Sequence, residues 1–350
     1  QVGKTTLVRD FLETFTGKYR FDTGDDIRAR EVLGSESVKI LQQYAQGYDL
    51  VVVDEAQRIP GIGIGLKILV DHCPGLKVIV TGSSSFELSG QIGEPLTGRK
   101  FELHLFPIAQ LELKKIFSPF DLAAQLEDTL IYGSYPAIFD HELGPDARRQ
   151  FLMDLTGSYL LKDILELESV KSSKILLDLL RLLAFQVGNE VSLNELAVQL
   201  SIDSKTVGRY IDLFEKSFVV YSLRGYSRNL RKEIRKKQKY YFYDNGIRNA
   251  VISNFNPVSA RDDIGALWEN FIIMERLKKQ RYQPLWANNY FWRTWERQEV
   301  DFMEERDGMI YGFEMKYKER HLNPPSSWAQ NYPEAEFQVI HRENYLDFIT

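Results

Sequence analysis

The first six residues of the chain, Gln1-Val2-Gly3-Lys4-Thr5-Thr6, have the form of the second half of the pattern G-x-x-x-x-G-K-[ST]. In this pattern consecutive backbone N–H groups surround a β-phosphate, the lysine reaches the β- and γ-oxygens, and the hydroxyl holds Mg²⁺. The pattern therefore predicts that these six residues bind ATP and Mg²⁺, with Lys4 at the phosphates and Thr5 at the metal. It also predicts a glycine three residues before Gln1, so we expect that further residues precede this sequence.

Two short apolar runs predict buried strands that end in polar residues. Residues 50–53 (LVVV) are followed by Asp54 and Glu55, and residues 78–80 (VIV) are followed by a polar segment that contains Ser83. A continuous apolar run is typical of a strand that is buried on both faces. An acidic pair at the end of such a strand indicates a second Mg²⁺ ligand, Asp54, and a residue that orients or deprotonates the attacking water, Glu55. Ser83 is a candidate contact of the γ-phosphate. Ligands of α/β proteins bind at the carboxyl ends of strands, so we predict a P-loop NTPase domain with a parallel sheet.

Arg99 follows a loop rich in glycine and proline and directly follows Gly98. An arginine at such a place can stabilise charge in the transition state of phosphoryl transfer. The sequence leaves open whether Arg99 acts within its own chain or from a neighbouring copy in a homo-oligomer. It leaves equally open that Arg99 forms a surface ion pair.

Composition limits the remaining classes of protein. A length of 350 residues allows two or three domains. The single cysteine, Cys73, excludes a disulfide framework, and no apolar run reaches the roughly 18 residues that span a bilayer. We therefore expect a cytoplasmic protein without a membrane partner. The formal net charge of −5 means that any surface for nucleic acid must be local.

The middle of the chain predicts helices and then a winged helix. Apolar spacing over 121–187 is helical, and Ser192 with Glu195 forms a capping box that opens a second helix. Asp203 or Ser204 would cap a third helix at Lys205–Lys216. Strands at 218–221 and 240–243 would then flank a long wing. The basic residues of the wing segment 224–239 are Arg224, Arg228, Arg231, Lys232, Arg235, Lys236, Lys237 and Lys239.

This wing and the third helix, which carries Lys205, Thr206 and Arg209, predict contact with DNA through its phosphate backbone or a groove. The alternative is a wing that is only solvated, or one that docks on the acidic ATPase domain.

A second set of chemical residues lies between 264 and 318. A helix that contains Glu269 precedes a strand with Asp301 and a strand with Glu314-x-Lys316. The two-residue period of a strand places Glu314 and Lys316 on one face, which Asp301 can join from the adjoining strand. Carboxylates are the ligands that Mg²⁺ prefers, and a metal-bound water is a good nucleophile. Strands of alternating charge are also often merely solvated.

Several motifs resemble one widespread prokaryotic family. Residues 1–7 (QVGKTTL), 51–57 (VVVDEAQ), 81–88 (TGSSSFEL) and 96–99 (LTGR) are similar to the AAA-type ATPases that have a winged-helix middle and a C-terminal nuclease-like domain of unknown function. The region around Glu314-x-Lys316 resembles the PD-(D/E)xK nucleases. That resemblance implies metal ligands at Glu269, Asp301 and Glu314, and a catalytic lysine at Lys316.

We therefore predict an α/β protein of four parts. These are an AAA-type P-loop ATPase domain (1–120), a helical connector (121–170), a winged helix (171–255) and a PD-(D/E)xK-like domain (256–350). The predicted activity is hydrolysis of ATP to ADP and phosphate, coupled to a DNA-handling module in which Mg²⁺-dependent cleavage is open. The alternative is a nucleotide-gated regulatory or scaffold protein with a catalytically silent nuclease fold.

Overall fold

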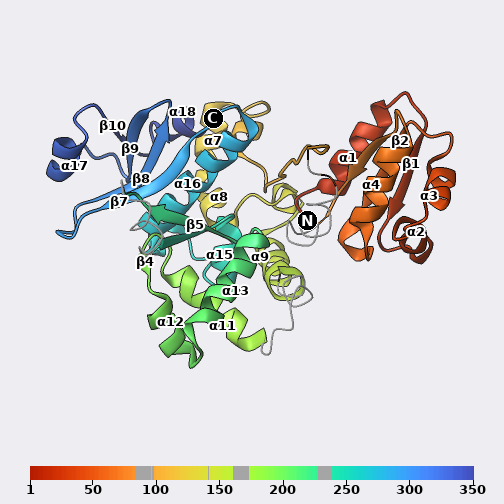
Figure 1. The fold of residues 1–350 in the computed structure, drawn as a ribbon. Coiled ribbons are helices and arrows are strands. Elements are labelled where there is room, and N and C mark those ends of the chain that lie inside the picture. The colour runs from red at the N-terminus through yellow and green to blue at the C-terminus, as the bar shows by residue number, and fades with distance from the viewer. Residues whose placement is uncertain (83–95, 97, 141, 161–172, 228–237) are drawn as a thin grey trace. The chain divides into compact units, whose positions relative to one another are not determined.

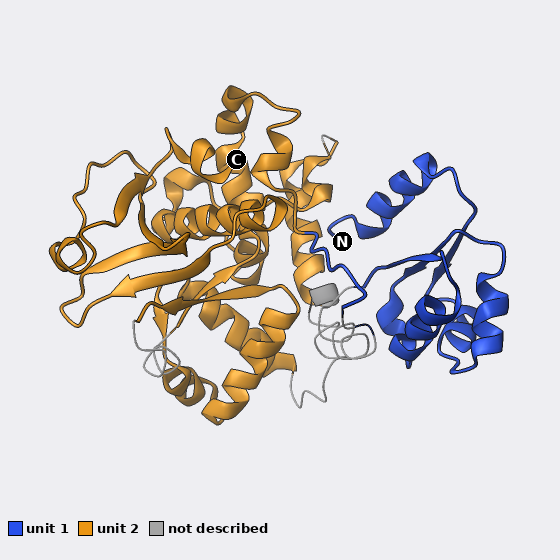
Figure 2. Cartoon of the chain, turned by 45° about the horizontal axis from the view of Figure 1, so that its top comes forward, with its two compact units in different colours: residues 1–105, 166–168 blue, residues 106–165, 169–350 orange. Residues whose placement is uncertain are grey.

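A computed structural model describes residues 1–82, 96, 98–140, 142–160, 173–227 and 238–350 (Figure 1). These residues divide between two compact units, unit 1 within residues 1–105 and unit 2 within residues 106–350 (Figure 2). Within the described part of the chain, no helix has both the length and the apolar character that crossing a bilayer requires.

Unit 1 contains a parallel sheet, as the sequence predicts, and this sheet has three strands and is covered by helices. Its strand order is β1-β2-β3. The elements in chain order are α1 (Lys4–Thr14), β1 (Tyr19–Thr23), α2 (Ile27–Leu33), α3 (Val38–Ala45), β2 (Leu50–Asp54), α4 (Ile62–His72) and β3 (Lys77–Val80). The strand β1 was not predicted, because its sequence, YRFDT, contains no apolar run.

The central strand β2 explains why this sequence forms a layered domain. All five of its residues are buried, and its side chains alternate between the two faces of the sheet. Val51 and Val53 pack into the core formed with α2, α3 and α4. Leu50 and Val52 pack on the other face against Leu12 of α1. The alternation therefore fixes α1, which begins with the phosphate-loop residues, on one face of the strand that ends in Asp54.

Unit 2 consists of helices and one mixed sheet. Its helices in chain order are α6 (Gln110–Leu113), α7 (Pro119–Ala124), α8 (Leu126–Tyr132), α9 (Pro145–Asp154), α11 (Ser173–Phe185), α12 (Leu193–Leu200), α13 (Ser204–Lys216), α15 (Asn245–Val251), α16 (Ile264–Tyr282), α17 (Ser326–Asn331) and α18 (Tyr345–Ile349). Its strands are β4 (Glu190–Val191), β5 (Val220–Gly225), β6 (Gln238–Phe242), β7 (Asn288–Arg293), β8 (Glu299–Arg306), β9 (Met309–Met315) and β10 (Glu336–Ile340).

The helices α11, α12 and α13 with β4, β5 and β6 have the element order expected of a winged helix. Ser192 caps α12 by accepting from the Glu195 N–H, and Asp203, rather than Ser204, caps α13 by accepting from the Thr206 N–H at 2.8 Å. The strand predicted at 218–221 begins at Val220, because Phe218 has a left-handed backbone with φ 54°.

The sheet of unit 2 continues from β4, β5 and β6 into the C-terminal strands. Its order is β10-β9-β8-β7-β5-β6-β4. The link is the parallel pairing of β5 with β7, in which Arg224 faces Tyr290 and Gly225 faces Phe291. The domain boundary expected at 255 stays a prediction, and the sheet runs across it.

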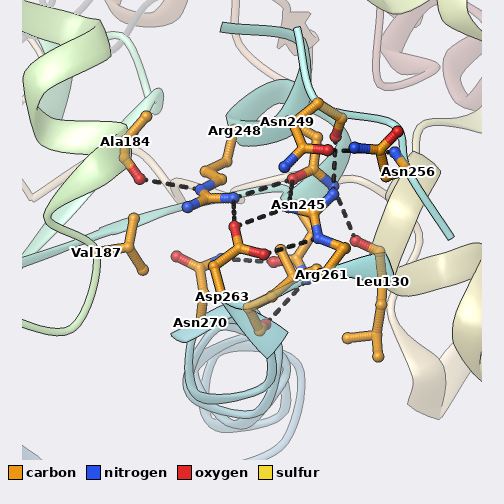
Figure 3. A network of polar contacts seen from close by, with 12 residues as sticks. Leu130, Ala184, Val187, Asn245, Arg248, Asn249, Asn256, Arg261, Asp263 and Asn270 are labelled. Atoms are coloured by element: carbon orange, nitrogen blue, oxygen red, sulfur yellow. Dashed lines mark hydrogen bonds and ion pairs between the residues drawn. The ribbon is translucent and has the colours of Figure 1, made fainter. Parts of the chain in front are cut away.

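A buried polar network joins helices of unit 2 (Figure 3). Asp263 accepts from both Arg248 and Arg261, with the two Arg261 bonds at 2.8 Å. Arg248 also donates to the Ala184 carbonyl of α11 at 3.0 Å, and Asn249 donates to the Ile131 carbonyl of α8 at 2.8 Å. Since buried charges require partners, this network fixes α8, α11, α15 and the start of α16 to one another.

Candidate functional site

The phosphate-loop residues lie at the start of α1, where backbone donors are available. Gly3 precedes the helix in a left-handed conformation, with φ 91°. Glycine adopts this conformation without a Cβ clash, which allows the chain to turn into the helix. The first N–H groups of a helix have no intrahelical partner, and together with the helix dipole they favour an anion. The N–H groups of Lys4, Thr5 and Thr6 therefore lie at a helix end that favours an anion.

Asp54 lies between hydroxyls from two other segments. Thr5 Oγ1 donates to Asp54 Oδ2 at 2.8 Å, and the Thr81 hydroxyl donates to the other carboxylate oxygen. Asp54 is buried, at 6% exposed. The parallel register of β2 and β3, in which Val53 faces Val80, brings Thr81 next to Asp54. A hydroxyl and a carboxylate that share one point are suitable ligands for Mg²⁺, so these residues fit the metal of a nucleotide complex.

Glu55 lies directly after β2 in a left-handed conformation with φ 51°. Its carboxylate accepts from Gln57 Nε2 at 2.6 Å, an interaction that we did not predict. In the sequence Asp-Glu-Ala-Gln, Gln57 lies two residues after Glu55, and this spacing is the only sequence signal for the contact.

Of the two further residues predicted at the nucleotide site, the structure describes Arg99 but not Ser83. The Arg99 guanidinium forms an ion pair with Asp71 of α4, in the same unit. Ser83 lies outside the described residues, and Thr81 is the residue at the end of β3 that contacts Asp54.

The three residues predicted on β8 and β9 lie together in unit 2. Lys316 Nζ lies 2.7 Å from Glu314 Oε1 and 3.7 Å from Asp301 Oδ2. In the antiparallel register of β8 and β9, Phe302 faces Phe313, so Asp301 and Glu314 are opposite one another. Asp301 Oδ2 also accepts from the Met315 N–H at 2.9 Å.

Glu269 of α16 faces a second lysine that the sequence assigned to the wing. The prediction that Lys239 belongs to the wing was wrong, because Lys239 lies on β6 and is only 1% exposed. Its Nζ atom lies 2.5 Å from Glu299 Oε1 and 3.5 Å from Glu269 Oε1. Tyr241 donates its hydroxyl to Glu269 Oε1 at 2.6 Å. We use the name carboxylate–lysine cluster for Glu269, Glu299, Asp301, Glu314, Lys239 and Lys316.

Burial and mutual charge shift the ionisation of the cluster. Burial raises the pKa of Glu269 to about 7, while the Lys239 ammonium acts to lower it. Burial and the Asp301 carboxylate raise the pKa of Glu314. Burial alone would lower the pKa of Lys239, but the carboxylates of Glu269, Glu299 and Asp301 raise it above its ordinary value.

The carboxylate–lysine cluster, as it lies, does not fit a divalent metal. Metal ligands direct oxygen lone pairs at one point, and here ammonium groups occupy such points. Over the described ranges, no three His, Cys, Asp or Glu side chains are arranged to hold a metal ion. The roles predicted for Glu269, Asp301 and Glu314 as ligands, and for Lys316 as a catalytic group, stay predictions.

The exposed basic residues of the predicted winged helix are described only in part. Lys205 and Arg209 are exposed on α13, and Arg224 is exposed on β5. The wing residues 228–237 lie outside the described part of the chain.

Comparison with known families divides the chain into three regions. Residues 1–114 match the model of an AAA domain, residues 123–258 match a domain of unknown function (DUF8612), and residues 264–342 match another domain of unknown function (DUF4143). With the contacts of Thr5 and Asp54, the first match defines the class: the chain has an N-terminal P-loop nucleotide-binding domain of the AAA type.

Relatives occur in bacteria and in an archaeon. An uncharacterized protein of Mycobacterium tuberculosis is 28% identical over 320 residues, which cover 90% of this chain and 68% of the relative. An uncharacterized protein of Haemophilus influenzae is 26% identical over 58% of this chain and 51% of its own length. An uncharacterized protein of Methanocaldococcus jannaschii is 23% identical over 71% of this chain and 57% of its own length.

Proposed function

We propose that the chain hydrolyses ATP and that unit 2 uses the nucleotide state to control contact with DNA. The observation that carries the ATPase proposal is the direct bond from Thr5 Oγ1 to Asp54, which also accepts from Thr81. These residues come from three separate segments and meet at the carboxyl end of the sheet, where α/β domains bind ligands.

Each residue of this site has a specific role in the proposal. The N–H groups of Lys4, Thr5 and Thr6 donate hydrogen bonds to phosphate oxygens, with Gln1, Val2 and Gly3 completing the loop, and the Lys4 ammonium reaches the β- and γ-phosphates. Thr5 and Asp54 would hold Mg²⁺, which neutralises charge on the phosphates when it is bound.

Glu55 orients a water molecule and takes its proton as the water oxygen bonds to the γ-phosphorus and the bond to the leaving ADP oxygen breaks. Arg99 supplies positive charge to the transition state, within the chain or from a neighbouring copy. Ser83 is proposed as a further γ-phosphate contact.

Nucleotide turnover tests this proposal. The protein is expressed together with any natural residues that precede Gln1. Glu55→Gln should retain ATP binding and lose about 10²-fold or more in turnover, since general-base catalysis contributes that much. Asp54→Asn should lose Mg²⁺-dependent binding as well. Asp10→Asn, on the exposed side of α1, is the charge-matched control. Unchanged turnover in both site variants would refute the proposal.

The DNA proposal rests on the exposed basic residues of α13. Lys205 and Arg209 lie on the surface of the third helix of the winged helix, the helix that enters a groove in many such proteins. Removing two phosphate contacts should weaken binding of duplex DNA and reduce its dependence on salt concentration. Fluorescence anisotropy with Lys205→Ala/Arg209→Ala measures this, with Lys174→Ala on α11 as the control. Equal affinity and an equal salt slope for both variants would refute DNA binding by α13.

For the C-terminal region we favour the silent nuclease fold over cleavage. The observation behind this choice is that the buried Lys239 ammonium lies 2.5 Å from Glu299 and 3.5 Å from Glu269 in the carboxylate–lysine cluster. Incubation of the wild-type chain with linear, nicked and single-stranded DNA and Mg²⁺ should show no cleavage. Cleavage that Glu314→Ala abolishes would favour the nuclease instead.

A further inference from the structure

The two lysines of the carboxylate–lysine cluster differ in their exposure to solvent. Lys239 is at the floor of the cluster and is 1% exposed, whereas Lys316 is at its rim and is 32% exposed. Lys239 comes from β6, in the region that matches DUF8612, and the carboxylates come from α16, β8 and β9, in the region that matches DUF4143.

The surroundings of Lys239 hold its ammonium between acids and under a ring. Glu299 lies 2.5 Å and Glu269 3.5 Å from Nζ, and Nζ lies 5.3 Å from the centre of the Phe291 ring. Glu299 is also approached by Arg293 Nε at 3.6 Å. Such a charge is stable in the interior only with these partners.

The wall on the Glu269 side leaves no room for a larger ligand. Gly188 has φ 76°, and a Cβ atom there would lie 3.1 Å from both carboxylate oxygens of Glu269. Tyr241 donates to one of these oxygens. The Glu269 carboxylate is therefore already covered by backbone, a hydroxyl and an ammonium.

We propose that the Lys239 ammonium takes the place of a divalent cation in the carboxylate–lysine cluster and prevents the cluster from binding one. A metal ion would have to displace the Lys239 ammonium from its carboxylate partners. Because Lys239 is buried, the displaced ammonium could not reach water, and an unpaired buried charge is costly. Two positive centres within about 4 Å also repel each other strongly where water is largely excluded. Lys316 does not have this effect, because at the rim it can turn into solvent without leaving a buried charge unpaired.

The proposal rests on the silent nuclease fold proposed above and deepens it by assigning a metal-excluding role to one residue, and it does not depend on ATP hydrolysis. It predicts that a hidden divalent site appears when the ammonium is removed. Among the described residues Glu299, Asp301 and Glu314 are not arranged around one point, so we expect their side chains to rotate toward the cation once the ammonium is gone and to supply the oxygen ligands that hard cations prefer.

Titration with Mn²⁺, observed by electron paramagnetic resonance and calorimetry, tests the proposal on the full chain without nucleotide. All variants carry Asp54→Asn, so that unit 1 contributes no metal site. The parent should bind no Mn²⁺ at the cluster. Lys239→Met should bind one Mn²⁺ per chain, with an affinity at least about tenfold above any residual binding by the parent, because one repelling charge is gone. Adding Asp301→Asn should abolish the gain.

Lys316→Met is the matched control, because it removes the other ammonium of the same cluster, and it should bind Mn²⁺ more weakly than Lys239→Met. If Lys239→Met does not fold, Lys239→Met/Glu269→Gln removes the ammonium together with one partner charge and should show the same gain. Binding of Mn²⁺ by the parent that Asp301→Asn abolishes would overturn the proposal. So would a folded Lys239 variant that binds no better than the parent.

Discussion

The network around Asp263 predicts a large and specific loss of stability in unit 2. Asp263→Ala removes the carboxylate shared by Arg248 and Arg261, whose side chains are 3% and 0% exposed. Removing one partner of a buried ion pair typically lowers the free energy of unfolding by 3–5 kcal/mol.

The remaining contacts place the expected loss at the lower end of that range. Arg248 keeps the Ala184 carbonyl and Asn249 as acceptors, and Arg261 keeps Asn249 and the Asn254 carbonyl. We therefore expect a loss of about 3 kcal/mol, equivalent to roughly a 150-fold change in the ratio of folded to unfolded protein.

The loss should also depend on pH. Although burial acts to raise the pKa of Asp263, the two arginines hold it below its ordinary value. Stabilisation by a carboxylate of lowered pKa is present above the pKa of the unfolded chain, about 3.9, and is lost as the pH falls through the folded value. The difference between wild type and Asp263→Ala should therefore be full at pH 7 and shrink below about pH 4.

Urea unfolding followed by tryptophan fluorescence measures this loss in unit 2 alone, because all five tryptophans lie after residue 267. Asp178→Asn breaks an exposed ion pair with Arg181 at 3.1 Å and should change the free energy of unfolding by less than about 1 kcal/mol. A loss for Asp263→Ala no larger than that of this control would refute the reasoning.

Four further substitutions have definite expected results. Glu269→Gln should gain stability relative to wild type as the pH rises from about 4.5 to 7, because a carboxyl whose pKa is raised to about 7 destabilises the folded state across that interval; urea unfolding at several pH values measures it, and a constant difference would contradict it. Trp292→Ala should lower the free energy of unfolding by about 3–5 kcal/mol, and Trp295→Ala by less than about 0.5 kcal/mol, because the first is buried and the second fully exposed. Gly24→Ala should destabilise unit 1, since its Cβ would overlap the Glu55 carbonyl oxygen; thermal unfolding monitored by circular dichroism should show an earlier transition, and an unchanged curve would contradict the overlap.

The meeting of Thr5 with Asp54 was predictable because its signals are local. Lys4 and Thr5 belong to one short pattern, and Asp54 ends a run of four apolar residues that only a buried strand explains. The contact of Thr81 with Asp54 was not predicted, because it depends on the register of β2 with β3. A pattern shows that polar residues follow a strand, and the pairing decides which of them touches the neighbouring strand.

The carboxylate–lysine cluster was predictable only in part, for the same reason. The spacing of Glu314 and Lys316 placed them on one face, and the structure brings Asp301 to them. Lys239 follows a run of basic residues and therefore looked like part of an exposed wing. Its burial depends on partners 30 and 60 residues later in the chain, Glu269 and Glu299, and no local pattern reports such distances.

The pairing of β5 with β7 limits where the chain can be cut into parts that fold separately. A cut in the segment between residues 258 and 264, where the two matched regions meet, would separate Lys239 and Tyr241 from Glu269 and Glu299. Lys239 would lose both of its ion-pair partners, Glu269 and Glu299. Each half would also expose an unpaired edge strand, β5 in one and β7 in the other, and such edges promote aggregation. We therefore expect the two regions to fold only together, and chimaeras with relatives should exchange them together.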